Sequence, residues 1–230
     1  MEEREHGVME TVNYTYEDLL LIDSYENREL YLDGEINQES IQPIIFHIIR
    51  YNRMDKDVPV DMRLPIILYI NSPGGDVTAG YSVIDIISNS KTPVYTVNIG
   101  MCDSMALYIF IAGTKRYSMP HSEFLLHDGC TGYMNSTAKV KDRVDFEMKQ
   151  LEQMNKDYIL AHTSISSKEY NSKYRMEYYF LPKEAKEIGV LDYIIGEDCD
   201  MSEELYIDHQ YCEVSENEEN PEVNEVDEGV

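Results

Sequence analysis

Basic residues are scarce in this chain, and their scarcity limits what it can bind. The 230 residues include 19 Lys and Arg against 44 Asp and Glu, so the formal net charge at pH 7 is −25. A nucleic-acid backbone is bound through clustered Lys and Arg. The composition therefore argues against a nucleic-acid partner.

Cysteines are also few, and they are scattered along the chain. Cys102, Cys130, Cys199 and Cys212 show no CxxC spacing, and no pair of histidines accompanies them. Zinc sites and disulfide frameworks both rely on regular spacings of that kind. We therefore expect no metal site and no structural disulfides, and we expect no cofactor.

Targeting signals and long apolar runs are lacking as well. The first ten residues, MEEREHGVME, are acidic and polar, unlike a secretory signal. No apolar run reaches the length of a membrane-spanning helix. We therefore expect a cytoplasmic protein that has no membrane partner.

Short apolar strands alternate with amphipathic helices through the middle of the chain. The run IILYIN, within residues 64–76, is almost continuously apolar, which is typical of a strand covered on both faces. A helical pattern follows at 76–90, and another strand at 92–100. This alternation predicts an α/β fold built on a parallel sheet. Further strands are expected at 28–37 and within 116–129, and further helices at 39–52, 136–163 and 181–190.

Composition divides the chain into three parts. We expect an N-terminal segment over 1–27, a folded domain over 28–196 and an acidic tail over 197–230. The tail is so rich in Asp and Glu that its composition predicts disorder. A tail that binds a partner is the alternative.

Three turns place chemically useful residues after predicted strands. The segments NSPGGD, GMCDS and HDG contain Gly74, Gly75, Ser104 and His127. Because the carboxyl ends of parallel strands meet at one edge of a sheet, we expect these residues to lie together. A serine acts as a nucleophile when a base takes its proton and N–H donors stabilise the oxyanion that forms.

Each of these residues also has an ordinary structural explanation. Ser104 could be the N-cap of the apolar helix that follows it, because serine is a preferred N-cap. His127 could be a core residue, and PGG a simple turn. Sequence spacing alone does not assemble a catalytic triad.

Four segments, in this order, resemble the proteolytic subunit of the ATP-dependent Clp protease, the ClpP family. They are YINSPGGDVTAG, IGMCDSM, PHSEFLLHDG and YYFLPKEAKEIGVLD, and the resemblance covers about residues 28–195. It implies a crotonase-like α/β fold with a mixed or parallel sheet and a protruding handle helix, here 136–163. It also implies that 28–196 is a peptidase domain and that 1–27 is a propeptide or axial loop.

The resemblance assigns roles to five residues. Ser104 corresponds to the nucleophile and His127 to the general base. Gly75 and Met105 correspond to the positions whose backbone N–H groups form the oxyanion hole. The third member of the triad is normally Asp, and the corresponding residue here is Glu177.

Several positions depart from the family pattern. Glu177 is one methylene longer than Asp. Two small residues normally precede the serine, and here they are Cys102 and Asp103. The charge of Asp103 either opposes the oxyanion or, if the side chain faces His127, helps to orient the imidazole.

The resemblance also implies partners. Family members form two stacked heptameric rings, and an AAA+ Clp ATPase feeds unfolded polypeptides into the chamber between them. We therefore expect a homo-oligomer joined through the handle. Unfoldase loops would dock at Tyr69, Tyr117 and Met119, although burial in the sheet explains these residues equally well.

Three functions remain open from the sequence. The leading one is a serine endopeptidase of the ATP-dependent Clp type, active in protein quality control. A catalytically weak or inactive ring subunit is the alternative suggested by Asp103 and Glu177. A crotonase-like acyl-CoA enzyme, which needs N–H donors but no Ser–His pair, is the third.

Overall fold

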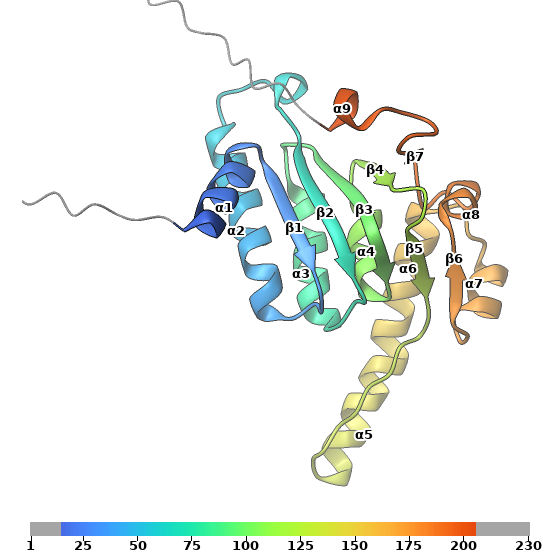
Figure 1. Ribbon diagram of the computed structural model, residues 1–230. Coiled ribbons are helices and arrows are strands. Elements are labelled where there is room, and N and C mark those ends of the chain that lie inside the picture. The colour runs from blue at the N-terminus through green and yellow to red at the C-terminus, as the bar shows by residue number, and fades with distance from the viewer. Residues whose placement is uncertain (1–14, 206–230) are drawn as a thin grey trace, which may run out of the picture.

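The structure, a computed structural model, describes residues 15–205 of the chain. A mixed sheet of seven strands forms the centre of this part (Figure 1). The strands run in the order β1-β2-β3-β4-β7, and β5 pairs with the end of β3 beyond β4. Only β6, which pairs with β5, is antiparallel. The strands are β1 (Glu29–Asp33), β2 (Ile66–Ser72), β3 (Val94–Asp103), β4 (Lys115–Ser118), β5 (Glu123–Leu126), β6 (Tyr178–Phe180) and β7 (Tyr193–Ile194).

The parallel α/β fold expected from the sequence is confirmed, with strands that the sequence did not predict. Residues 116–129 hold parts of two strands, β4 and β5, where one was expected. Pro120 lies between them, and proline has no N–H to donate to a sheet ladder. The antiparallel strand β6 was not predicted either.

The helices are α1 (Tyr16–Glu26), α2 (Gln38–Met54), η1 (Val60–Met62), α3 (Val77–Asn89), α4 (Met105–Ile111), α5 (Thr137–Phe146), η2 (Glu147–Leu151), α6 (Glu152–His162), α7 (Ser167–Lys173), α8 (Pro182–Glu187) and α9 (Met201–Glu204).

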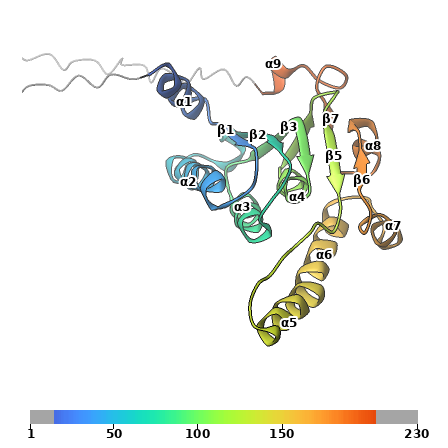
Figure 2. The same ribbon diagram turned by 60° about the horizontal axis from the view of Figure 1, so that its bottom comes forward.

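The central strands are covered on both faces, as the apolar run in β2 predicts. Ile66, Leu68 and Ile70 belong to the larger core, together with the apolar residues of α2, α3 and α4. Ile67 and Tyr69 point to the other face and belong to a smaller cluster. This alternation follows from the period of two in a strand. Figures 1 and 2 show α2, α3 and α4 together on one face.

The helix expected at 136–163 is a handle that projects from the sheet in both views (Figures 1 and 2). It is continuous through α5, the single wide π-turn η2 and α6. Neither α5 nor η2 has a buried residue, and Phe146 and Met148 are exposed. Among the described residues, the outer half of the handle is contacted by Tyr133 from the preceding segment, through Arg143 and Glu147, but it buries none of its own side chains.

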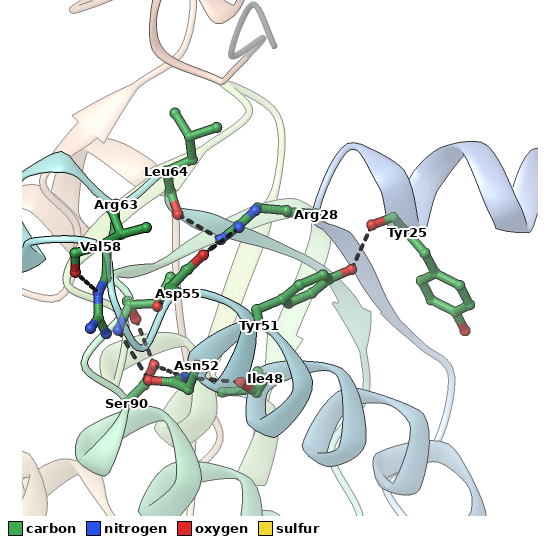
Figure 3. A network of polar contacts seen from close by, with 11 residues as sticks. Tyr25, Arg28, Ile48, Tyr51, Asn52, Asp55, Val58, Arg63, Leu64 and Ser90 are labelled. Carbon is green, nitrogen blue, oxygen red and sulfur yellow. Dashed lines mark hydrogen bonds and ion pairs between the residues drawn. The ribbon is translucent and has the colours of Figure 1, made fainter. Parts of the chain in front are cut away.

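A buried polar network ties the amino edge of the sheet together (Figure 3). Arg28, just before β1, donates two hydrogen bonds of 2.6 and 2.7 Å to the carboxylate of Asp55 at the end of α2. Thr92, just before β3, donates a third hydrogen bond of 2.7 Å to Asp55. The Tyr51 hydroxyl donates to the Tyr25 carbonyl and so connects α2 with α1.

The structure describes part of the expected N-terminal segment and part of the expected acidic tail. The N-terminal segment 1–27 contains α1, and its residues 1–14 lie outside the described part. In the tail, residues 197–205 form the α9 segment, whose Leu205 is buried, and 206–230 lie outside the described part. None of the helices in residues 15–205 has the length and apolar character needed to cross a membrane.

Candidate active site

Three turns at the carboxyl edge of the sheet bring the predicted residues together. Strands β2, β3 and β5 run parallel, and their arrowheads reach the same edge in Figure 1. Gly75 follows β2, Ser104 follows β3 and His127 follows β5. The Ser104 N–H donates a 2.9 Å hydrogen bond to the carbonyl of Leu125, which fixes the serine turn against β5.

The backbone of Ser104 adopts a conformation that few residues other than glycine tolerate. Its φ is 54° and its ψ is −123°, at the sharp turn between β3 and α4. Holding a side chain there costs roughly 1–3 kcal/mol of strain. Ser104 occupies the N-cap position of α4, but its hydroxyl makes no capping hydrogen bond. The N-cap explanation therefore does not account for a serine here.

Two backbone N–H groups are available beside the serine. Met105 is the first residue of α4, where the N–H has no partner within the helix. Gly75 forms a parallel bridge with Ile36, in which the Asp76 N–H and the Gly74 carbonyl make the hydrogen bonds. In such a bridge the N–H of the central residue, Gly75, points away from the partner strand.

The glycine pair also allows the two turns to approach each other closely. A Cβ on Gly74 would lie 2.7 Å from the Ser104 Cβ and 2.9 Å from the Met105 nitrogen. A Cβ on Gly75 would lie 2.4 Å from the Ile36 carbonyl oxygen, and its φ is +147°. Both positions therefore require glycine, and the Gly74 backbone lies directly against the Ser104 turn.

The imidazole of His127 contacts the carboxylate of Glu177. The antiparallel pairing of β5 and β6 aligns Leu126 with Tyr178, so His127 and Glu177 are the next pair along. Nδ1 of His127 lies 3.1 Å from Oε1 of Glu177. The His127 side chain is 19% exposed and the Glu177 side chain 61% exposed. Nε2 is thus the ring nitrogen left for another partner.

The serine and the histidine are not hydrogen-bonded to each other in this structure. Among residues 15–205 the Ser104 hydroxyl has no hydrogen-bond partner. Catalytic hydrogen bonds are often long in unliganded enzymes and shorten when substrate binds. The structure therefore places both residues at one edge without joining them.

Asp103 lies on the same face of the sheet as the His127–Glu177 pair. The parallel register pairs Asp103 with Leu125, so its nearest diagonal neighbours on β5 are Glu123 and His127. Burial, followed by the negative charge of Glu123, raises the pKa of Asp103 to about 6, although the nearby His127 lowers it. Asp103 Oδ1 is buried and has no hydrogen-bond partner in the described residues.

A second ion cluster lies next to the histidine. Arg175 lies 3.9 Å from Asp128 and 3.3 Å from Glu152 on the handle helix α6. This arginine is therefore engaged by two carboxylates. No group of three or more His, Cys, Asp and Glu side chains in residues 15–205 is arranged to hold a metal ion.

The residues expected to receive an unfoldase lie on the opposite face from α2, α3 and α4. Tyr69 and Tyr117 are buried in the smaller cluster, with Met119 packed against it. Leu205 belongs to the same cluster, and Glu204 accepts a 2.7 Å hydrogen bond from the Tyr117 hydroxyl. The start of the acidic tail therefore covers this face of the sheet.

Sequence reasoning named Asp103 and left open whether it faces His127, but it missed Glu123. A signal was present, because Glu123, Leu125 and His127 alternate along one strand and share a face. Using that signal requires knowing that β5 pairs with β3, which the sequence does not state.

The chain is similar in sequence to known proteins over most of its length. A family model described as Clp protease matches residues 14–198. A Treponema denticola protein named ATP-dependent Clp protease proteolytic subunit 2 is 30% identical over 191 residues, covering 80% of this chain and 90% of the relative. Subunit 3 from a Synechococcus species is 33% identical over 175 residues, covering 74% and 82%. Subunit 2 from Treponema pallidum is 26% identical over 181 residues, covering 76% and 86%. The match to the family model, together with these relatives, shows that the chain belongs to the Clp protease family.

Proposed function

We propose that this chain is a serine endopeptidase subunit of the ATP-dependent Clp type. The observation that supports it most directly is the 3.1 Å contact of His127 Nδ1 with Glu177. That contact leaves Nε2 free at the edge of the sheet where Ser104 stands in its strained turn. A carboxylate, an imidazole and a serine in these roles form the triad of serine hydrolases.

In the proposed reaction, His127 Nε2 takes the proton of the Ser104 hydroxyl as Oγ attacks the peptide carbonyl. Glu177 holds the imidazole in the tautomer that presents Nε2 and stabilises the imidazolium ion that forms. His127 then returns the proton to the leaving amine. Water, activated by the same imidazole, hydrolyses the acyl-enzyme.

The oxyanion of the tetrahedral intermediate would accept hydrogen bonds from the N–H groups of Gly75 and Met105. Met105 is at the N-terminus of α4, where the helix dipole also favours negative charge. Donors of this kind, fixed before the reaction begins, each contribute roughly 100- to 1,000-fold to the rate.

The assembly is part of the proposal. The exposed apolar residues of the handle, including Phe146 and Met148, fit a contact with a second copy, as in two stacked heptameric rings. The relatives are named subunits of an ATP-dependent protease, which suits an AAA+ Clp ATPase as partner and unfolded polypeptides as substrates. Docking at Tyr69, Tyr117 and Met119 would require the α9 segment to move aside.

A ring subunit with little or no activity is the second candidate. The buried carboxylate of Asp103 favours it, because a negative charge beside the serine opposes an oxyanion. An acyl-CoA enzyme has no such support, since the acids around the site would repel an anionic ligand.

A fluorophosphonate probe, which reacts with activated serines, tests the proposal. The purified protein should be labelled, whereas Ser104→Ala and His127→Ala should not. Ser167→Ala, which removes an exposed serine at the start of α7, is the matched control and should be labelled like the wild type. Sedimentation in the same buffer measures whether the protein forms rings.

The outcomes separate the candidates. Labelling that depends on both Ser104 and His127, with hydrolysis of a peptide, supports the peptidase. A ring-sized particle that is never labelled supports the inactive subunit. Labelling that persists in Ser104→Ala would place the reactive serine elsewhere and overturn the proposal.

A further inference from the structure

Asp103 is a buried carboxylate without a partner. The residue is 8% exposed, and its Oδ1 has no hydrogen bond to any residue in 15–205. The other oxygen, Oδ2, has no hydrogen bond to described residues either, but it is not enclosed like Oδ1. Buried carboxylates are normally hydrogen-bonded or paired with a cation. An unpaired one at a candidate active site calls for a ligand that completes it.

The surroundings of Asp103 make that ligand a cation. Glu123 and Glu177 act on its charge unfavourably, and His127 is the only described group that acts favourably. Arg175, which lies beside Asp128 next to the histidine, is already held by Asp128 and Glu152. The site therefore has a local excess of negative charge with no Lys or Arg of the described chain to neutralise it.

The position of Asp103 determines where the cation would sit. Asp103 directly precedes Ser104, and consecutive Cα atoms are about 3.8 Å apart. A group paired with Asp103 would therefore belong to a substrate residue close to the bond that Ser104 attacks. Glu177 already contacts His127 Nδ1, so Asp103 is not needed to orient the imidazole.

We propose that Asp103 forms a subsite for a cationic nitrogen of the substrate, supplied by a Lys or Arg side chain or by a free N-terminus beside the scissile bond. This inference rests on the proposed peptidase function and adds a substrate class to it. Bringing a cation to the unpaired carboxylate converts a buried repulsive charge into a charge-assisted hydrogen bond. The expected preference over an uncharged side chain is roughly tenfold to a hundredfold in kcat/KM.

A matched peptide series tests the subsite. Peptides that differ only in Lys, Arg, norleucine or Glu beside the scissile bond are compared, each with a free or an acetylated N-terminus. The proteins are the wild type, Asp103→Asn and the control Asp61→Asn. Asp61→Asn removes the same charge from the exposed η1 turn at the other edge of the sheet.

We expect the wild type and Asp61→Asn to prefer the Lys and Arg peptides, and Asp103→Asn to lose that preference while still cleaving the norleucine peptide. A fall in rate on acetylation that is equal for the Lys and norleucine peptides and depends on Asp103 would identify the N-terminus as the source of the cation. Equal rates for Lys and norleucine peptides that acetylation leaves unchanged in the wild type would overturn the inference. So would an equal loss on all peptides in Asp103→Asn with an altered pH profile, because that result indicates a role in positioning His127.

A measurement of peptide binding distinguishes a failure of the Asp103 subsite from a failure of the proposed peptidase function. Fluorescence anisotropy of the Lys and norleucine peptides is measured with Ser104→Ala, with and without Asp103→Asn. A tighter Lys peptide that depends on Asp103 would support the subsite even if Ser104 were never labelled. Labelled Ser104 with no binding preference would leave the peptidase standing and remove the subsite. Circular dichroism of each variant checks that it is folded.

Discussion

Asp55 lies at the amino edge of the sheet and Asp103 at the carboxyl edge, and both are almost fully buried, at 4% and 8% exposure. Asp55 accepts two hydrogen bonds from Arg28 and one from Thr92. Asp103 accepts none from the described residues. One edge therefore uses a buried charge to join segments of the chain, whereas the other holds an equally buried charge that contributes no bond to the fold.

The two carboxyl groups also differ in the direction of their pKa shifts. Burial alone would raise the pKa of Asp55, but the hydrogen bonds from Arg28 and Thr92 bring it below its usual value. Burial and the charge of Glu123 raise the pKa of Asp103 to about 6. Ionisation of Asp55 therefore stabilises the fold, and ionisation of Asp103 destabilises it.

The largest effect is expected at the amino edge. Asp55→Ala leaves the Arg28 guanidinium buried without its carboxylate, and loss of one partner of a buried ion pair costs about 3–5 kcal/mol. Urea denaturation measures the loss in free energy of unfolding. The exposed pair of Lys56 and Asp57 is the control, and Lys56→Ala should change the stability by less than about 1 kcal/mol. A similar small change for both variants would contradict the comparison.

The next effect is on activity at the carboxyl edge. Glu177→Gln keeps the shape of the side chain but removes the charge that stabilises the protonated His127. We expect peptide hydrolysis to fall about 100-fold, which is about 2.7 kcal/mol, with little change in stability because Glu177 is 61% exposed. Steady-state kinetics and thermal melting measure the two quantities. An unchanged rate would remove Glu177 from the proposed triad.

The third effect is the pH dependence of the stability that Asp103 contributes. The native pKa of Asp103 is about 6 against a reference value of 3.8, so the native state binds more protons than the unfolded state between these values. The free energy of unfolding is therefore undiminished below pH 4, where Asp103 is protonated, and it falls as the pH rises through about 6. Asp103→Asn should be more stable than the wild type by about 3 kcal/mol at pH 7.5. The gain should nearly vanish at pH 4, and a gain of equal size at both pH values would contradict this assignment.

The smallest effect concerns Ser104. Glycine tolerates φ 54° without a Cβ penalty, so Ser104→Gly should raise the free energy of unfolding by about 1 kcal/mol while abolishing labelling by the probe. Ser104→Ala keeps a Cβ and loses no capping bond, so its stability should match that of the wild type. An N-cap role for the serine would instead lower the stability of Ser104→Ala by about 1 kcal/mol.

Much of this site follows from the sequence because it depends on strand order. Apolar runs predict β2 and β3, parallel strands end at one edge, and the residues that follow them must gather there. Ser104 and Gly75 could be brought together on that basis. The capping box of Ser166 and Glu169 at the start of α7 can likewise be read from the sequence, because capping depends only on residues three apart.

The remaining features depend on pairings between distant segments. Glu177 reaches His127 only because the short strand β6, which has three residues, pairs antiparallel with β5. The face occupied by Asp103 depends on β5 pairing with β3 after the break at Pro120. Composition also predicted a disordered tail from residue 197. That prediction gave too little weight to Leu205, which is buried with Tyr69 and Tyr117 in the smaller cluster and so anchors the start of the tail on the sheet.

The turn at Ser104 has a practical consequence for engineering. Its backbone suits glycine better than serine, so a library of variants screened for heat resistance alone would enrich Ser104→Gly. Such a screen would then discard the one hydroxyl that the proposed chemistry requires. A thermostable form of this protein should therefore be selected for peptide turnover in every round, with residue 104 held as serine.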